Sequence, residues 1–120
     1  MTESGKMQAD GDLTAALLDS MKAPVLFADS EHKVRYMNRA AIDYYERGEA
    51  LLGTDLLECH NVQSQMLMKE ILQAMQQGEE ERLITDNEKH RIYMRAVRDR
   101  DGRLLGYYER YEPPVKMAGD

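Results

Sequence analysis

The chain has 120 residues, of which 42% are apolar and 32% charged, with a formal net charge of −6. The length and composition are those of one globular domain, and the acidic balance argues against a nucleic-acid backbone as the direct partner. The single cysteine cannot form an internal disulfide, and no apolar run approaches the roughly 20 residues of a membrane span, so we expect a cytoplasmic protein.

The N-terminal part predicts a tail followed by a helix. Residues 1–11 are small and polar, which is typical of a disordered tail and lacks the apolar segment of a secretory signal. Asp12 is a suitable N-cap, and Pro24 ends the helix because the residue before a proline disfavours helical angles. The apolar positions that recur at helical spacing between them are Leu13, Leu17, Leu18 and Met21.

The next segment predicts a hairpin and a capped helix. Two short strands, at residues 25–28 and 34–37, flank the turn sequence DSEHK. Asn38 offers a capping side chain to a helix over residues 40–47, and Gly48 ends that helix.

A connector and the clearest helix of the chain follow. The sequence TDLLECHN predicts one helical turn within an irregular connector. The sequence VQSQMLMKEILQAMQQG then predicts a long helix that Gly78 closes. Its apolar stripe consists of Met68, Ile71, Leu72 and Met75.

The last third of the chain predicts three strands. They lie at residues 82–85, 91–97 and 104–111, and an Asp-Gly turn joins the last two. Ile92, Met94 and Ala96 alternate on one face of the middle strand. The order of helices and strands predicts an α+β fold with a five-stranded antiparallel sheet over residues 12–112, followed by a C-terminal tail over residues 113–120.

Three sequence stretches resemble the PAS domain family. VLFADSEHKVRYMNRAA is similar to the opening hairpin and the asparagine-capped helix of that family. LLGTDLLECHNVQSQ resembles the glycine-containing turn before the long helix, and AVRDRDGRLLGYYE resembles the closing hairpin. The resemblance spans roughly residues 13–112 and implies a PAS-like sheet with helices packed on one face. The Cys59-His60 pair with Ser64 and the AVRD hairpin are further similar to PAS domains of bacterial hemerythrin-associated signalling proteins.

The resemblance implies a sensor or protein-interaction module and not an enzyme. It implies a pocket between sheet and helices that holds a small ligand, and a homodimer formed through the N-terminal helix and the open sheet face. After the last strand the sequence reads YEPPVKMAGD, without the junction that often leads into an output domain. We therefore expect a stand-alone domain whose output partner is a separate signalling protein.

The adjacent residues Cys59 and His60 are the strongest candidates for chemistry. Their spacing fits neither a metal site nor the C-x-x-C-H haem attachment motif, and the residues around Cys59 do not match a flavin photosensor. One hypothesis is that both residues are structural. A second is that His60 ligates haem iron in a gas or redox sensor, since a histidine near the long helix does so in some family members. A third is a small enzyme that uses Cys59 or His60 as a nucleophile or base, although no paired acid and base accompanies them.

Two sets of residues are the predicted binding surfaces. The predicted ligand pocket consists of Tyr45, Leu57, His60, Met68, Ile84, Ile92 and Met94. The predicted dimer interface consists of Leu13, Leu17, Leu18, Met21 and Tyr107. We place Tyr107 there because Tyr93, Tyr107 and Tyr111 are expected on the open face of the sheet, where amphipathic tyrosines suit a partner surface.

Overall fold

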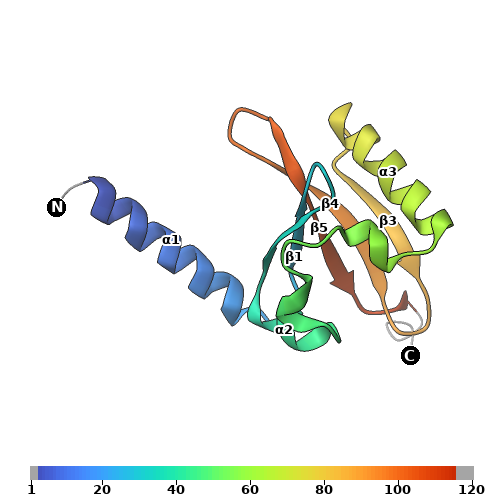
Figure 1. Cartoon of the computed structure of the whole chain (residues 1–120), viewed down its shortest axis with the longest axis horizontal. Coiled ribbons are helices and arrows are strands. Elements are labelled where there is room, and N and C mark those ends of the chain that lie inside the picture. Colours follow the sequence, from blue (N-terminus) through green and yellow to red (C-terminus); the bar gives the residue numbers. More distant parts are fainter. Residues whose placement is uncertain (1–2, 116–120) are drawn as a thin grey trace.

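The computed structural model describes residues 3–115, with side chains from residue 11 onward. A single sheet forms its centre, later helices cover one face of that sheet, and the N-terminal helix projects away from the domain (Figure 1). The elements in chain order are α1 (Glu3–Ser20), β1 (Leu26–Asp29), β2 (Val34–Met37), α2 (Arg39–Tyr44), the 3-10 turns η1 (Gly48–Leu51) and η2 (Leu56–Cys59), α3 (Val62–Gln76), β3 (Glu81–Asp86), β4 (Arg91–Arg98) and β5 (Leu104–Glu112).

The sheet has five antiparallel strands in the order β2-β1-β5-β4-β3. The last strand, β5, therefore lies in the middle, between the first strand and the β3–β4 hairpin. Its register sets Tyr108 opposite Phe27 of β1 and Glu109 opposite Met94 of β4. The predicted α+β fold with a five-stranded antiparallel sheet is confirmed.

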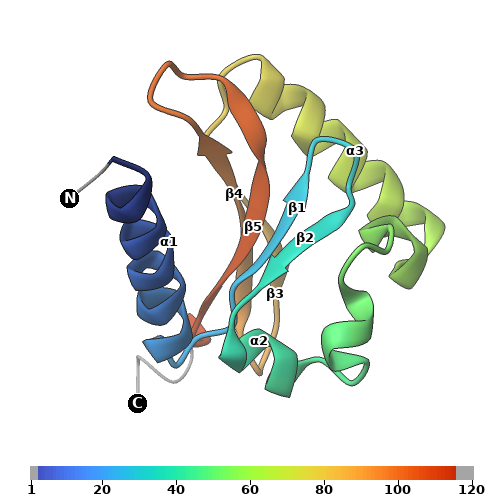
Figure 2. The ribbon, with the colours of Figure 1, turned by 60° about the vertical axis from the view of Figure 1, so that its left-hand side comes forward.

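The two faces of the sheet differ in what covers them. The inner face packs against α2, the two 3-10 turns and α3, while α1 stands on the other side (Figure 2). The predicted stripe of α3 is buried against the inner face. The core residues that carry this packing include Leu26, Ala28, Val34, Met37, Met68, Ile71, Leu72, Met75 and Met94.

Side-chain caps begin the elements that surround the inner face. The Asn38 side chain accepts a hydrogen bond from the Ala41 N–H, as predicted, and Asn61 accepts one from the Ser64 N–H at the start of α3. Asp55 accepts from the Leu57 N–H at the start of η2. Each cap satisfies a backbone donor that has no partner inside its own helix, so these polar residues fix where α2, η2 and α3 begin.

Two predicted helices have different ends in the structure. α2 covers Arg39–Tyr44 and not residues 40–47, so Tyr45 and not Gly48 ends it. The first helix begins at Glu3 and not near Asp12, so residues 3–11 are helical where a disordered tail was expected. Residues 1–2 and the end of the predicted C-terminal tail, residues 116–120, lie outside the described residues.

The placement of Tyr107 on the open sheet face is wrong. Tyr107 is fully buried on the inner face, opposite Ala96, and its hydroxyl lies 2.8 Å from Nδ1 of the buried His32. Alternation along β5 places Tyr111 on the same inner face and Tyr108 on the outer one. Tyr107 therefore belongs to the core and not to a dimer surface.

Candidate functional site

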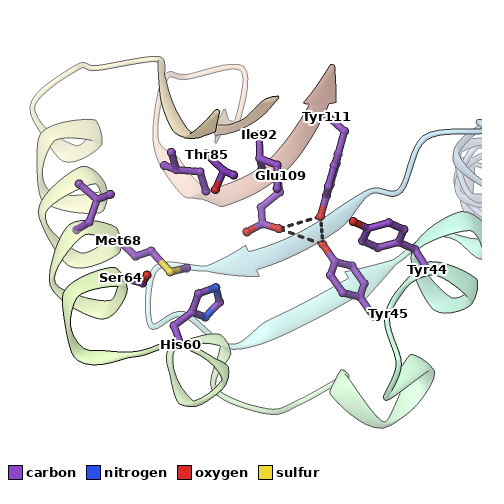
Figure 3. Close-up of a pocket in the computed structure, with 11 residues that line it drawn as sticks. Tyr44, Tyr45, His60, Ser64, Met68, Thr85, Ile92, Glu109 and Tyr111 are labelled. Atoms are coloured by element: carbon purple, nitrogen blue, oxygen red, sulfur yellow. Dashed lines mark hydrogen bonds between the residues drawn. The ribbon is translucent and has the colours of Figure 1, made fainter. Parts of the chain in front are cut away.

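A cavity of about 250 Å³ lies between α3, the inner face of β3, β4 and β5, and the end of α2 (Figure 3). Its apolar lining comes from the long helix and the sheet: Leu67, Met68, Ile84 and Ile92. Its aromatic lining is Tyr44, Tyr45 and Tyr111, and its other polar lining is His60, Ser64, Thr85 and Glu109. An apolar space with a few convergent polar groups is the usual form of a small-molecule site.

Five of the seven residues predicted for the ligand pocket line this cavity. They are Tyr45, His60, Met68, Ile84 and Ile92. Leu57 and Met94 are instead buried in the hydrophobic core. That any of these residues binds a ligand stays a prediction.

Glu109 is the most buried polar residue among the six lining residues that the predicted pocket lacked; the other five are Tyr44, Ser64, Leu67, Thr85 and Tyr111. Its side chain is on the inner face of the central strand and only 7% exposed. The Tyr45 hydroxyl donates to Glu109 Oε2 at 3.0 Å, and the Tyr111 hydroxyl lies 3.3 Å from the same oxygen. The two hydroxyls also contact each other (Figure 3). Register counted from the Asp-Gly turn would have missed it, because Arg98 pairs with Leu104 and the β-bulge between Val97 and Arg98 then shifts the pairing so that Glu109 lies opposite the inward-facing Met94.

The two tyrosines remain hydroxyl donors. Burial raises the pKa of Tyr45, and the nearby Glu109 and Tyr111 raise it further. Burial followed by the charge of Glu109 also raises the pKa of Tyr111. Both phenols therefore keep their protons at any physiological pH and can serve the carboxylate as donors.

His60 is held in place by the backbone. Its Nδ1 lies 2.9 Å from the Leu56 carbonyl oxygen, which can only accept, so Nδ1 carries a proton. Its own carbonyl accepts from Gln65 Nε2 at 2.8 Å. The ring points into the cavity (Figure 3), so Nε2 is the atom it offers there.

Cys59 and His60 do not form a catalytic pair. Cys59 is exposed, and its sulfur is 3.9 Å from Arg47 Nη1, whereas His60 Nδ1 is engaged with Leu56. A nucleophile and its base need a shared hydrogen bond, which this arrangement does not supply. Among residues 3–115 there is also no group of three or more His, Cys, Asp or Glu side chains arranged to hold a metal ion.

A second surface lies on the outer face of the sheet, under the end of α1. It is an apolar groove of about 450 Å³ lined by Leu18, Met21, Val25, Phe27, Tyr36, Val97 and Tyr108. Leu13 and Leu17 continue the apolar surface along α1 and are 58% and 59% exposed. Four of the five predicted dimer residues thus lie on α1 or on the groove, and only Tyr107 does not. Within the described part of the chain, no helix is long and apolar enough to cross a bilayer.

Comparison with known proteins identifies the family. A sequence model described as PAS domain matches residues 14–112, which is most of the chain. The chain belongs to the PAS domain family. This confirms the resemblance that the three sequence stretches indicated. A search of curated proteins gives no match.

Several solved bacterial protein structures share the fold of this PAS domain. A C-terminal domain from Streptococcus mutans is 17% identical with a TM-score of 0.71, and the alignment covers 91% of this chain and 87% of that one. The PAS domain of Bordetella pertussis BvgS is 19% identical with a TM-score of 0.62, over 92% and 90% of the two chains. The Vibrio cholerae Aer2 receptor, described as a dual PAS-heme oxygen sensor, is 15% identical with a TM-score of 0.53, over 73% and 90%.

The cavity residues of this PAS domain do not fit haem. The cavity of about 250 Å³ and an adjoining space of about 240 Å³, which share Tyr45, His60 and Glu109, are each below the roughly 300–1,000 Å³ of pockets for drug-sized ligands, and haem is larger than those ligands. Haem also carries two propionates, whereas the charged residue in the lining is the carboxylate Glu109 and neither lysine nor arginine lines the cavity within the described residues. His60 offers a free Nε2, but the space in front of it suits a smaller and less anionic molecule.

Proposed function

We propose that this PAS domain is a sensory module that binds a small molecule in the cavity between α3 and the sheet. It signals through contacts of α1 and the outer sheet face, either with a second copy of the chain or with a separate signalling protein. The observation that carries the proposal is the polar cluster of Glu109, Tyr45 and Tyr111, which lines one side of a cavity whose other side is mainly apolar. A buried polar cluster that is only partly hydrogen-bonded lowers the stability of the fold. Such clusters occur most often at binding and catalytic sites, which supports a ligand site here.

A short structural path supports coupling between the cavity and α1. Tyr45 lines the cavity and is the C-cap of the six-residue helix α2. Asn38 is the N-cap of the same helix, and its Nδ2 donates to the Leu18 carbonyl of α1 at 2.8 Å. A ligand that moves Tyr45 therefore acts on an element tied directly to α1. A ligand shifts α2 only if it binds one conformation of the domain more tightly than another conformation in which α2 lies differently.

Ligand binding is tested by filling the cavity. Ser64→Leu adds apolar volume from α3 into the cavity, whereas Gln73→Leu makes a comparable change on the exposed surface of the same helix. We expect metabolites that raise the melting temperature of the wild type and of Gln73→Leu to leave Ser64→Leu unchanged. Equal responses in all three proteins would place the binding site elsewhere and refute this part of the proposal.

The interaction surface is tested by the oligomeric state. Leu17→Glu places a charge on the exposed apolar side of α1, and Leu52→Glu makes the same change at a leucine that is also exposed but far from α1 in the sequence. Light scattering at increasing concentration should show weaker self-association for Leu17→Glu alone. If the wild type is monomeric at all concentrations, the homodimer is refuted.

A further inference from the structure

We propose that the cavity selects a small organic ammonium ion, with Glu109, held by two tyrosine hydroxyls, as its counter-ion. This inference rests on the proposed ligand-binding function and names the chemical class of the ligand. It follows from the hydrogen-bond count at Glu109, the aromatic lining and the size of the cavity.

Glu109 is a buried carboxylate without a cationic partner. It is only 7% exposed, and no lysine, arginine or histidine forms an ion pair with it within the described residues. The carboxyl groups that do form ion pairs in this domain lie elsewhere on its surface. A buried charge is normally paired, because its removal from water is costly. The missing partner is therefore to be sought in the ligand.

The tyrosine hydroxyls use only part of the hydrogen-bond accepting capacity of the Glu109 carboxylate. Tyr45, Tyr111 and Glu109 Oε2 form three contacts, but the two hydroxyls carry only two protons. If Tyr111 donates to Tyr45, then Tyr45 alone donates to Oε2 over the shorter distance of 3.0 Å. A carboxylate accepts through both oxygens at about four lone-pair positions. Glu109 thus keeps most of its accepting capacity for another donor.

The second carboxylate oxygen is the one offered to a ligand. Oε1 of Glu109 has no hydrogen bond within the described residues, and it points into the cavity, away from the two tyrosines (Figure 3). Across the cavity, the neutral form of His60 offers Nε2 as an acceptor, since Nδ1 donates to Leu56. Two acceptors that face each other across one space suit a ligand rich in N–H donors.

Aromatic rings form the wall beside Glu109. Tyr44 packs edge-on against Tyr45 and Tyr111, with ring centroids 5.0 Å and 5.5 Å apart. These ring contacts hold the Tyr45 and Tyr111 hydroxyls beside Oε2, so the aromatic cluster fixes the carboxylate and leaves Oε1 directed into the cavity. With a carboxylate and no lysine or arginine in the described lining, the same cavity repels carboxylates and phosphates.

The cavity limits the size of the ammonium ion. Its volume of about 250 Å³ is below the roughly 300–1,000 Å³ of pockets for drug-sized ligands. The apolar residues on α3 and the sheet leave room for a short alkyl or single-ring substituent. The ligand class is therefore a primary or secondary amine of this size, protonated at neutral pH.

The test compares matched probes of different charge. Methylamine, isobutylamine and benzylamine are each titrated into ¹⁵N-labelled full-length protein, alongside the alcohol and the carboxylate of the same skeleton. We expect at least one amine to shift the amide signals around Glu109 and His60 and to bind about 10-fold or more tightly than its alcohol, with no binding of its carboxylate. An alcohol or carboxylate that binds as tightly as its amine would overturn the inference.

A charge-removing variant tests the role of Glu109. Glu109→Gln keeps the shape of the side chain, and Glu112→Gln is the matched control on the same strand but on the outer face. Glu109→Gln should weaken amine binding about 10-fold or more and leave alcohol binding within a few-fold, while Glu112→Gln changes neither. Equal amine affinity in all three proteins would refute the counter-ion role. If Glu109→Gln does not fold, the comparison of probes on the wild type still decides.

The outcomes separate this inference from the proposed function. If alcohols bind in the cavity as tightly as amines, or if Ser64→Leu abolishes the response to a non-amine metabolite, the domain senses a ligand but ammonium selection is wrong. If no probe of the series shifts the cavity signals and no metabolite distinguishes Ser64→Leu from Gln73→Leu, both proposals are overturned.

Discussion

Replacement of Asn38 should destabilise the domain far more than replacement of an ordinary helix cap. The Asn38 side chain is fully buried and makes four hydrogen bonds. Its Oδ1 accepts from the N–H groups of Val25 and Ala41, and its Nδ2 donates to the carbonyls of Leu18 and Ala23. One amide thus joins α1, the start of β1 and α2.

The magnitude follows from the number of bonds. A net contribution of about 1 kcal/mol for each hydrogen bond gives about 4 kcal/mol for Asn38→Ala, a large share of a typical free energy of unfolding of about 5–15 kcal/mol. Asn61→Ala is the control, because that cap is exposed and its side chain accepts one hydrogen bond, from Ser64. It should cost about 1 kcal/mol.

An aspartate at this position separates capping from bridging. Asn38→Asp keeps the oxygen that caps α2 but replaces the donor that faces Leu18 and Ala23 with a second acceptor. Asp and Asn are equally good caps, so a role in capping alone predicts no loss. We expect a loss of about 2–4 kcal/mol, because two hydrogen bonds become repulsive contacts.

Urea unfolding followed by circular dichroism measures these differences. With a slope of about 2 kcal/mol per molar urea, Asn38→Ala should lower the midpoint by about 2 M and Asn61→Ala by about 0.5 M. Equal midpoints for the wild type and Asn38→Asp would refute the bridging role, and so would equal midpoints for the two alanine variants.

Two further predictions concern the β1 strand and the turn after it. A Cβ at Gly106 would lie 2.1 Å from the Ala28 carbonyl oxygen, so Gly106→Ala must force β5 away from β1. In urea unfolding this variant should lose about 3 kcal/mol or more of stability. The control Gly102→Ala places its Cβ in open space and should lose about 1 kcal/mol. Burial lowers the pKa of His32 below its usual 6.5, so the unfolded state binds the proton more readily and stability should fall as the pH drops below about 6.5. Asparagine tolerates the positive φ of position 32, so His32→Asn should reduce the loss of unfolding free energy at low pH. The control His90→Asn should leave this loss unchanged. The same dependence of stability on pH in His32→Asn and the wild type would contradict the role given to His32.

Patterns that depend on neighbouring residues predicted most of the fold. The stripe of α3 has the helical period and is buried as expected, and Asn38 begins α2 as its position suggested. The start of α1 was not predictable in this way. Residues 3–11 contain no apolar stripe, and Gly5 and Gly11 favour a break, so periodicity had nothing to detect there.

The face assignment on β5 failed for a physical reason. Tyr107, Glu109 and Tyr111 share one face by alternation, and a charged residue among them favours the solvent side. The structure turns this face inward, where tyrosine hydroxyls bind the carboxylate. Local sequence consistency is most often broken at functional sites, and Glu109, a charged residue on the buried face, lines the cavity.

The central position of β5 has a consequence for how the chain folds. The β1–β2 hairpin and the β3–β4 hairpin are each local, but they meet only through the strand that is synthesised last. The sheet therefore cannot close before β5 is available, and closing it requires pairing between β1 and β5 across more than half of the sequence. Until then, each hairpin presents an open edge that can pair with another chain. Glu109 and Tyr111 lie on this late strand, so the cavity forms only when the sheet is complete.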